Sequence, residues 1–499
     1  MIQKKDKSQK VLFYFTIYTY LFFLFKVSYE LLIDTIYSEV YIALFILLTT
    51  ITLPLVYLIA RKNFNLFEPI YSYIYFFTLA FVYTTFYVLE DTGSLFKSLN
   101  FDISDSTTPT VIYLISFSII CFYIGYMFSN ILHKDKKFHY FNEVDIENFK
   151  SYIGIVSVLY LITILFRFYG YSNGFLGSTA SETGIKPPNI PMISAFYFLS
   201  NNWYVFFTYF AVISFSSNKY FKIFMVVLAL EFLFTMISGN RRFAITIILS
   251  YLASYWYIHR MFPWKKMLLP SVLILFVFLP ISTVYGYFLA NNIGVSVSFF
   301  DTVGYLYDSV FFLIESPNGK SIFDYVLFPI VQSFNLLWNT CVAYTQFYLN
   351  EIQIGAVGVK SFLGQLLPTI LNPEKHTYSR QFLQMYGDYA YVVPREHSTL
   401  SINFLSEMII SYGVYGMFIG MFIIGFLMNF FYKIFNTKTT PPLFRIYFIS
   451  NIVFFSYGLS GNWIGGDLIL TYRLLIYFVI LYAFYKILLI KNPEYKGGK

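Results

Sequence analysis

Long apolar runs alternate with short polar connections along almost the whole chain. A helix needs about 20 predominantly apolar residues to cross the hydrocarbon core of a bilayer, and the runs have this length. The pattern therefore predicts an all-α polytopic membrane protein, a single membrane domain over residues 1–499. It predicts twelve spanning helices, over residues 11–33, 38–60, 67–90, 108–132, 150–170, 193–216, 222–238, 242–259, 267–290, 400–432, 444–461 and 466–487.

One long stretch, residues 291–399, interrupts this series between the ninth and tenth predicted spans. We expect it to form a large extracytoplasmic loop that contains amphipathic helices. Within it, residues 325–348 are long enough to cross the membrane, but their polar members follow helical spacing. These are Gln332, Asn335, Asn339 and Gln346. Their spacing predicts an amphipathic helix on the outer surface or along a cavity.

Composition supports a membrane protein and places its ends. Hydrophobic residues make up 58% of the chain and charged residues 12%, which excludes an ordinary soluble domain. Most Lys and Arg residues fall in the terminal segments and in alternate connections, and such residues accumulate on the cytoplasmic side. We therefore expect both termini in the cytoplasm. Topology explains the net charge of +8 without a nucleic-acid partner.

Several kinds of chemistry have no support in the sequence. The two cysteines, Cys121 and Cys341, give no metal-ligand spacing, and we predict neither a metal nor a cofactor. The longest cytoplasmic connection, residues 133–149, is too short for a nucleotide-binding domain, and no phosphate-binding loop motif occurs. Asp145 and Glu147 are compatible with a metal-nucleotide site, but the solvated-loop interpretation is favoured. A substrate must then arrive on the outer face or from the bilayer, and a lipid-linked diphosphate is the natural candidate.

Arginines near the outer face are candidates for binding such a diphosphate. Arg241 and Arg242 follow Ser238-Gly239-Asn240 in a short outer turn and open the next helix. A guanidinium matches phosphate oxygens, and helix N-termini favour anions. The alternative is interfacial snorkelling beside acidic partners. Arg473 and Arg167 lie inside predicted spans, where a charge usually faces protein or a water-filled cavity. For Arg473 an interhelical pair with Glu231 is a structural alternative.

Two short runs in the outer stretch carry candidate acid–base groups. His376-Thr377-Tyr378-Ser379-Arg380 and Pro394-Arg395-Glu396-His397-Ser398 supply histidine, which exchanges a proton near neutral pH. Ordinary surface pairs and hydrated loop residues are the alternative. Glu407, at the start of the tenth predicted span, is either a base or the partner of an arginine. The glycines that follow it, Gly413, Gly416, Gly420 and Gly425, are interpreted as helix-packing positions.

These residues resemble the Wzy-type polymerases of O-antigen and capsule repeat units, to which the O-antigen ligases are related. The run T-x-x-S-G-N-R at Thr235–Arg241 is similar to a turn of that family. The order of features late in the chain is also similar to that family. A long outer loop carries Leu366-Leu367-Pro368 and is followed by S-E-M-I-I-S-Y-G-V-Y-G within Ser401–Gly420. The architecture is similar as well. Residues 171–191 depart from the pattern, because they offer only Lys186 and Glu182 where the family often has arginines.

The resemblance implies a glycosyltransferase C-like fold and metal-independent, inverting glycosyl transfer between undecaprenyl-diphosphate-linked glycans. It implies substrate binding by Arg241 and a site carboxylate at Glu407. The remaining candidates match no motif: His397 and Glu396 as catalytic groups, and Arg242, Arg380, Arg395, Arg473, His376 and Tyr378 as substrate-binding groups. Membrane lipid and a chain-length regulator are candidate partners. The rival functions are a ligase on the same scaffold and a lipid-linked oligosaccharide flippase or other secondary transporter.

Overall fold

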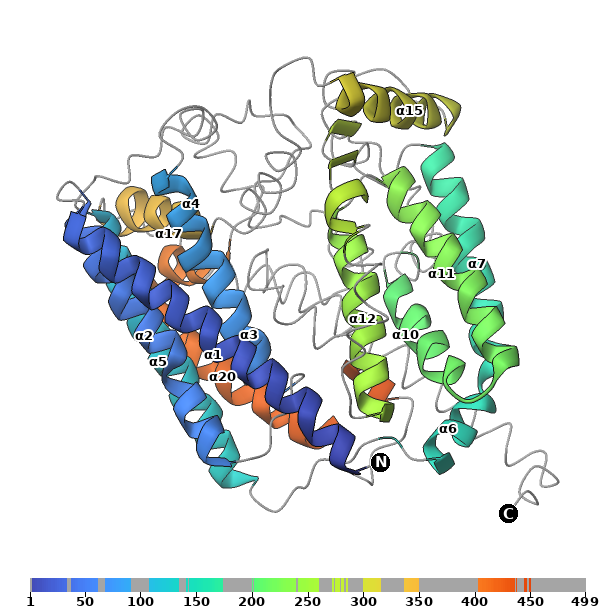
Figure 1. Cartoon of the computed structure of the whole chain (residues 1–499), viewed down its shortest axis with the longest axis horizontal. Helices are drawn as coiled ribbons and strands as arrows, with labels where there is room; N and C mark the ends of the chain where they lie inside the picture. The colour runs from blue at the N-terminus through green and yellow to red at the C-terminus, as the bar shows by residue number, and fades with distance from the viewer. Residues whose placement is uncertain are drawn as a thin grey trace, which may run out of the picture.

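The computed structural model describes residues 2–33, 37–61, 68–90, 107–133, 141, 143–173, 200, 202–238, 241–259, 272, 274–278, 280–281, 284–285, 299–315, 336–349, 403–435, 437, 444–446 and 448–449. The regular elements within these ranges are all helical, without a strand. They form two helical bundles, each with its own apolar core (Figure 1).

The first bundle joins the N-terminal helices to a helix from the last quarter of the chain. One helix of this bundle runs continuously from α3 through the π-helical η1 into α4. Its elements are α1 (Ile2–Ile33), α2 (Ser38–Arg61), α3 (Pro69–Phe77), η1 (Thr78–Tyr83), α4 (Thr84–Glu90), α5 (Thr107–Leu132), α17 (Leu336–Val342), η4 (Ala343–Tyr348) and α20 (Phe404–Phe435).

The second bundle is built from the middle of the chain. Its elements are α6 (Glu143–Lys150), α7 (Ile153–Ser172), α10 (Trp203–Ser214), α11 (Asn218–Ser238) and α12 (Arg241–His259). Short η3 (Ile274–Phe278) packs on α11 through Phe278, and α15 (Phe299–Glu315) lies across the end of α11 (Figure 1). Ile446 and Ile449, which follow α20, return the chain to this second core.

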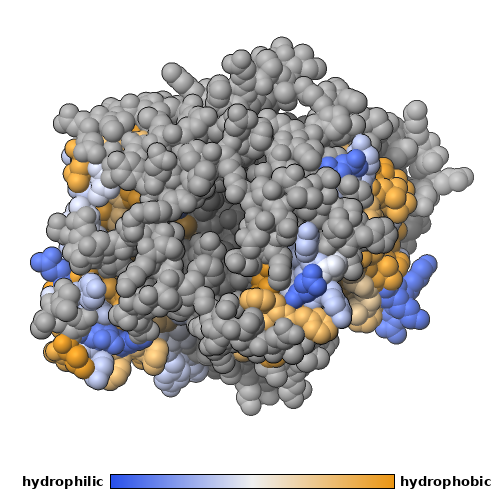
Figure 2. All heavy atoms as spheres, turned by 90° about the horizontal axis from the view of Figure 1, so that it is seen from above, coloured by the Kyte–Doolittle hydropathy of each residue, from blue (hydrophilic) through white to orange (hydrophobic). Residues whose placement is uncertain are grey.

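Four of the helices are long and apolar enough to cross a membrane: Thr16–Ile33, Thr107–Leu132, Ile153–Tyr171 and Phe404–Phe435. Exposed apolar side chains follow helical spacing on them, for example Val158, Leu161 and Leu165 on α7. Figure 2 shows apolar side chains at both flanks of the molecule. These features agree with an all-α membrane protein. The number of twelve spans stays a prediction, since most of residues 260–298 and 450–499 lie outside the described ranges.

Successive helix ends alternate between the two ends of the molecule, as the predicted connections require (Figure 1). The start of α1, the end of α5 and α6 lie at one end. The end of α11, the start of α12 and the surface helix α15 lie at the other.

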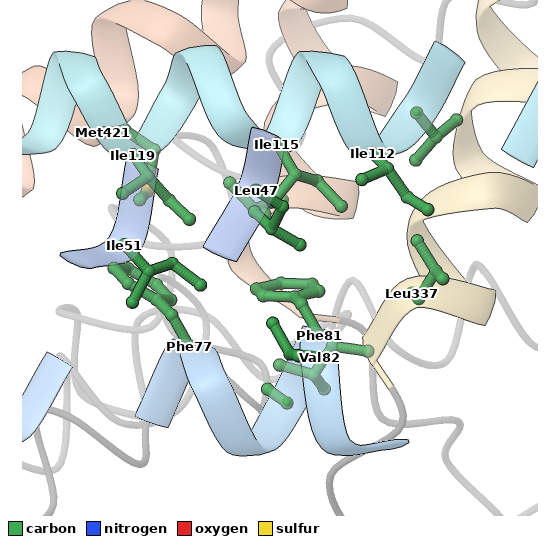
Figure 3. Packing of buried hydrophobic residues seen from close by; sticks show 14 of the residues in the cluster. Leu47, Ile51, Phe77, Phe81, Val82, Ile112, Ile115, Ile119, Leu337 and Met421 are labelled. Carbon is green, nitrogen blue, oxygen red and sulfur yellow. The ribbon is translucent and has the colours of Figure 1, made fainter. Parts of the chain in front are cut away.

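The core of the first bundle is filled by aliphatic and aromatic side chains from all nine of its elements. Leu47 and Ile51 of α2 face Phe77, Phe81 and Val82, while Ile112, Ile115, Ile119, Leu337 and Met421 close the cluster (Figure 3). Tyr73 and Phe122 also meet in this core, with ring centroids 4.6 Å apart.

The described part of the segment 325–348, which begins at Leu336, contributes side chains to this core. Leu336, Leu337 and Phe347 are buried, and so is Asn339. The elements α17 and η4 pack against α20 and α5. Gln332 and Asn335 lie outside the described residues, so the polar face predicted for residues 325–348 stays a prediction.

The closest helix contact in the first bundle is between α5 and α20, at Gly125 and Gly425. A Cβ at Gly125 would overlap the carbonyl oxygen of Phe422, and a Cβ at Gly425 would overlap that of Phe122. The helices run parallel, because contacts advance along both from Phe117–Phe418 onward. Backbones can approach this closely only where side chains are small. The packing interpretation of Gly425 is therefore confirmed.

Side chains of α20 add hydrogen bonds to the backbone of α5 below this crossing. Asn429 Nδ2 donates to the Tyr126 carbonyl at 2.8 Å. Lys433 Nζ donates to the carbonyls of Asn130 at 3.1 Å and His133 at 2.9 Å. The last carbonyls of a helix have no partner within it, so Lys433 acts as a C-terminal cap for α5.

We expect Gly125→Ala to lower stability, because the added methyl must push α20 away from α5. Overpacking of this kind costs about 1–3 kcal/mol. The control is Gly154→Ala in α7, where a Cβ would meet nothing within 4 Å and helix propensity improves. Thermal unfolding of both purified variants in nanodiscs measures the difference. Equal apparent Tm values for the two variants would contradict the close crossing.

Candidate functional site

Glu407 lies on a short buried arm at the start of α20. Helix α20 covers Phe404–Phe435, but it consists of two helices that meet at Gly413, whose backbone is not helical, with φ 68° and ψ −169°. A positive φ favours glycine. Residues 404–412 therefore form a separate helical arm, and residues 414–435 form the span. The prediction of one continuous span over 400–432 was wrong, because a glycine in an apolar run does not reveal its dihedral angles.

The arm folds back against the span that follows it. In a straight helix, residues 404 and 420 would be about 24 Å apart. Here a Cβ at Gly420 would lie 3.0 Å from the Phe404 ring and 3.0 Å from Met408 Sδ. Gly416 approaches Tyr412 even more closely. Gly416 and Gly420 thus provide the small surface on which the arm packs, as their sequence pattern predicted.

The arm is buried over all but its last residue, Tyr412. Residues 404–411 are all buried, and Glu407 is only 1% exposed. A carboxylate in such a place is excluded from bulk water, which strengthens its interactions with nearby polar groups. Asn403 caps the arm: its Oδ1 accepts hydrogen bonds from Ser406 N at 2.8 Å and Ser406 Oγ at 2.9 Å. Asparagine is among the strongly preferred N-cap residues.

The second candidate region is the turn between α11 and α12. The predicted boundaries at Ser238 and Arg241 are confirmed, since α11 ends at Ser238 and α12 begins with Arg241 and Arg242. The end of α11 is held by Thr235, whose Oγ1 donates to the Glu231 carbonyl at 2.7 Å. Both arginines therefore stand in the first turn of a helix, the position where backbone N–H groups favour an anion.

Beneath this turn, α7 and α11 share a buried ion pair. Arg167 Nη1 donates to Glu231 Oε2 at 2.6 Å, and Tyr160 Oη donates to Glu231 Oε1 at 2.8 Å. Arg167 is 2% exposed and Glu231 is 0% exposed. Glu231 lies seven residues before the end of α11, about 10 Å along the helix. Arg167 thus occupies the position beside Glu231 that the sequence had left open to Arg473.

Aromatic rings enclose the Arg167 guanidinium. Its Cζ lies 4.1 Å from the ring centroid of Phe234 and 5.4 Å from that of Trp203. Cation–π contacts strengthen when they are desolvated. Nη2 makes no hydrogen bond to the part of the chain that the structure describes. One guanidinium therefore joins three helices, α7, α10 and α11, near the end of the bundle that carries Arg241.

The acidic pair Asp145 and Glu147 lies on helix α6 rather than in a loop. Arg445 Nη1 donates to Asp145 Oδ2 at 3.0 Å, and Lys150 pairs with Glu147. Each carboxylate thus has a cation as its neighbour, which leaves the metal-nucleotide interpretation without support. Among the described residues, no group of three His, Cys, Asp or Glu side chains could hold a metal ion.

The structure places only some of the predicted site residues. Glu407 belongs to the first bundle, whereas Arg241 and Arg242 begin α12 in the second, on the side drawn toward the first bundle (Figure 1). The other candidates lie outside the described residues: His376, Tyr378, Arg380, Arg395, Glu396, His397 and Arg473. Sequence reasoning missed Asn403, although an asparagine directly before an apolar run is a recognisable helix-start signal.

Comparison with known proteins identifies no relative: no family model, no curated protein and no solved structure matches the chain. The fold by itself supports a broad class, that of a helical membrane protein.

We expect Arg167→Met to destabilise the protein strongly, because it leaves Glu231 buried without its cation. Breaking a buried pair costs about 3–5 kcal/mol. The double variant Arg167→Met/Glu231→Leu removes both charges and should recover much of that loss. The control is Lys150→Met, which breaks the pair with Glu147, whose side chain is 68% exposed, and changes stability little. Unfolding of the parent and the three variants in nanodiscs tests the coupling, and a double variant no more stable than Arg167→Met would refute it.

Proposed function

We propose that this chain polymerises undecaprenyl-diphosphate-linked oligosaccharide repeat units into a surface polysaccharide, at the outer face of a bacterial inner membrane. The proposed scaffold has twelve spans, a glycosyltransferase C-like architecture and both termini in the cytoplasm. The observation that carries the proposal is the buried carboxylate of Glu407, on an arm that starts directly after the long stretch of residues 291–399. This is the position that the resemblance to repeat-unit polymerases assigns to a site carboxylate.

The proposed reaction joins two lipid-linked glycans. A terminal hydroxyl of the incoming unit attacks the anomeric carbon of the growing glycan, from the face opposite to its diphosphate. A new C–O bond forms, the bond to the diphosphate oxygen breaks, and the lipid diphosphate leaves with inversion. The hydroxyl proton passes to a base, for which Glu407, Glu396 and His397 are the candidates. A carboxylate shielded from water is suited to this role.

Cations balance the charge that develops on the departing diphosphate. Arg241 and Arg242 are the leading candidates, because they open α12 at the end of the molecule where α15 also lies. Arg473, Arg380, Arg395, His376 and Tyr378 remain proposed substrate contacts. The partners in this proposal are the lipid-linked donor and acceptor, the surrounding membrane lipid and a chain-length regulator. Neither a metal nor a cofactor takes part in the proposed step.

A second candidate function is a flippase or other secondary transporter for lipid-linked oligosaccharides. The Arg167–Glu231 pair favours it, because ionisable groups deep within helices are typical of transport pathways. The structural role of this pair in joining α7 to α11 accounts for it without transport. A ligase that passes finished glycan to another acceptor would use the same chemistry as the polymerase.

Deletion of the gene in the native host separates these functions. We expect single repeat units at the cell surface in place of a polymer ladder, together with an accumulation of lipid-linked units on the outer leaflet. The measurement is a gel of surface polysaccharide beside an analysis of lipid-linked intermediates. Full-length polymer retained on its lipid carrier would indicate a ligase. Repeat units trapped on the cytoplasmic leaflet would indicate a flippase.

We expect complementation with Arg241→Ala or Glu407→Gln to restore protein level but not polymer, because the first loses a diphosphate contact and the second a base. The matched control is Lys222→Ala, which removes an exposed cation near the opposite end of α11 and should leave the ladder unchanged. Normal polymer length with Arg241→Ala would remove Arg241 from the site. Normal polymer with Glu407→Gln would remove Glu407 as the base.

A further inference from the structure

Asn403 connects the arm that carries Glu407 to a second helix. Besides the two bonds its Oδ1 accepts from Ser406, its backbone carbonyl accepts the Glu407 N–H at 3.0 Å. Its Nδ2 donates in the other direction, to the Leu336 carbonyl at 2.7 Å and to Thr340 Oγ1 at 3.0 Å. One amide side chain therefore caps the arm and fastens it to the first turn of α17.

The acceptors of Asn403 are themselves fixed. Thr340 Oγ1 donates to the same Leu336 carbonyl at 2.8 Å, which closes a ring of three hydrogen bonds. Asn403 and Thr340 are buried, as is Ser406. Water has no access to replace a lost bond, and an unmade bond in such a network is costly. The geometry of the first turn of the arm is thus determined by Asn403.

Glu407 lies one helical turn after Asn403, and its N–H is bonded to the Asn403 carbonyl. A change in the direction of the first turn therefore moves the Glu407 carboxylate. At the other end of the arm, Gly413 connects the arm to the span. Tyr348 of η4 lies against this glycine, since a Cβ at Gly413 would be 3.4 Å from the Tyr348 ring. The arm is consequently held at its start by α17 and at its end by η4, two elements from the stretch of residues 291–399.

We propose that Asn403 is a positioning residue, which sets the direction and depth of the Glu407 carboxylate through its bonds to Leu336 and Thr340. This inference rests on the proposed function, in which Glu407 takes the proton of the acceptor hydroxyl. A displaced base lowers the rate of the chemical step more than substrate binding, since misplacement by about 1 Å can cost a hundredfold in rate. Asn403 itself does not touch the substrate.

The test compares Asn403→Ala with Asn429→Ala in the full-length protein. Asn429 is the matched control because it lies on α20, is equally buried at 1% exposure, and donates one bond to a carbonyl of another helix. Both variants should lower the apparent Tm. In nanodiscs with purified lipid-linked repeat units, we expect Asn403→Ala to lower kcat about tenfold or more with little change in KM, whereas Asn429→Ala keeps kcat.

Two further variants separate capping from fastening. Asn403→Ser keeps an oxygen that can cap the arm but loses both donors to α17, so kcat should stay low although Tm rises toward that of the parent. Thr340→Val removes one of the two acceptors at nearly constant volume and should give a smaller loss of kcat. Full recovery of kcat in Asn403→Ser would overturn the fastening role.

The outcomes distinguish this inference from the proposed function. If Glu407→Gln abolishes transfer while Asn403→Ala and Asn429→Ala have equal kcat values, the positioning role of Asn403 is rejected. The assignment of Glu407 as the base is then still supported. If Glu407→Gln transfers at the parental rate, the base assignment falls and the role of Asn403 falls with it. A purified parent protein that elongates no lipid-linked glycan overturns both.

Discussion

The close parallel contact of α5 with α20 is the constraint on which the first bundle depends. At Gly125 and Gly425 the two backbones touch without intervening side chains, and Asn429 and Lys433 add bonds to the α5 carbonyls. In a membrane, where apolar side chains gain little from leaving lipid, such contact and such hydrogen bonds are the main sources of helix association. The arm with Glu407 packs on the part of α20 that follows it. The contact of α20 with α5 therefore also fixes the position of the arm in the bundle.

Polar groups inside the two bundles are accommodated in different ways. The second bundle neutralises charge with charge, through Arg167, Glu231 and Tyr160. The first bundle buries neutral groups around Asn403, and the acidic Glu407 lies one helical turn further along the same arm. Removal of one partner from the pair in the second bundle would leave an uncompensated buried charge. The proposed chemistry is placed in the first bundle because its candidate carboxylate lies on the arm that Asn403 caps.

Much of the helical framework follows from the sequence, but the details that make a site do not. Apolar run length predicted the helix ends near Ile33, Leu132 and Ser238 within a few residues, because the bilayer fixes how long an apolar helix must be. Run length does not specify rotation about the helix axis, so the partner of Glu231 could not be chosen between Arg167 and Arg473. Nor does it distinguish a packing glycine such as Gly425 from Gly413, where the same residue reverses the chain. Many aromatic side chains contact one another within the cores, for example Tyr73 with Phe122 and Phe224 with Tyr251.

The pairing of α5 with α20 also has a consequence for synthesis. Asn429 and its acceptor Tyr126 are 303 residues apart, and helices α6 to α12 of the second bundle are encoded between them. At about 5–20 residues per second, a ribosome needs roughly 15–60 s to make that interval. Until α20 has been made, α5 lacks the helix that contacts it at Gly125. Completion of the first bundle therefore depends on a helix that arrives late.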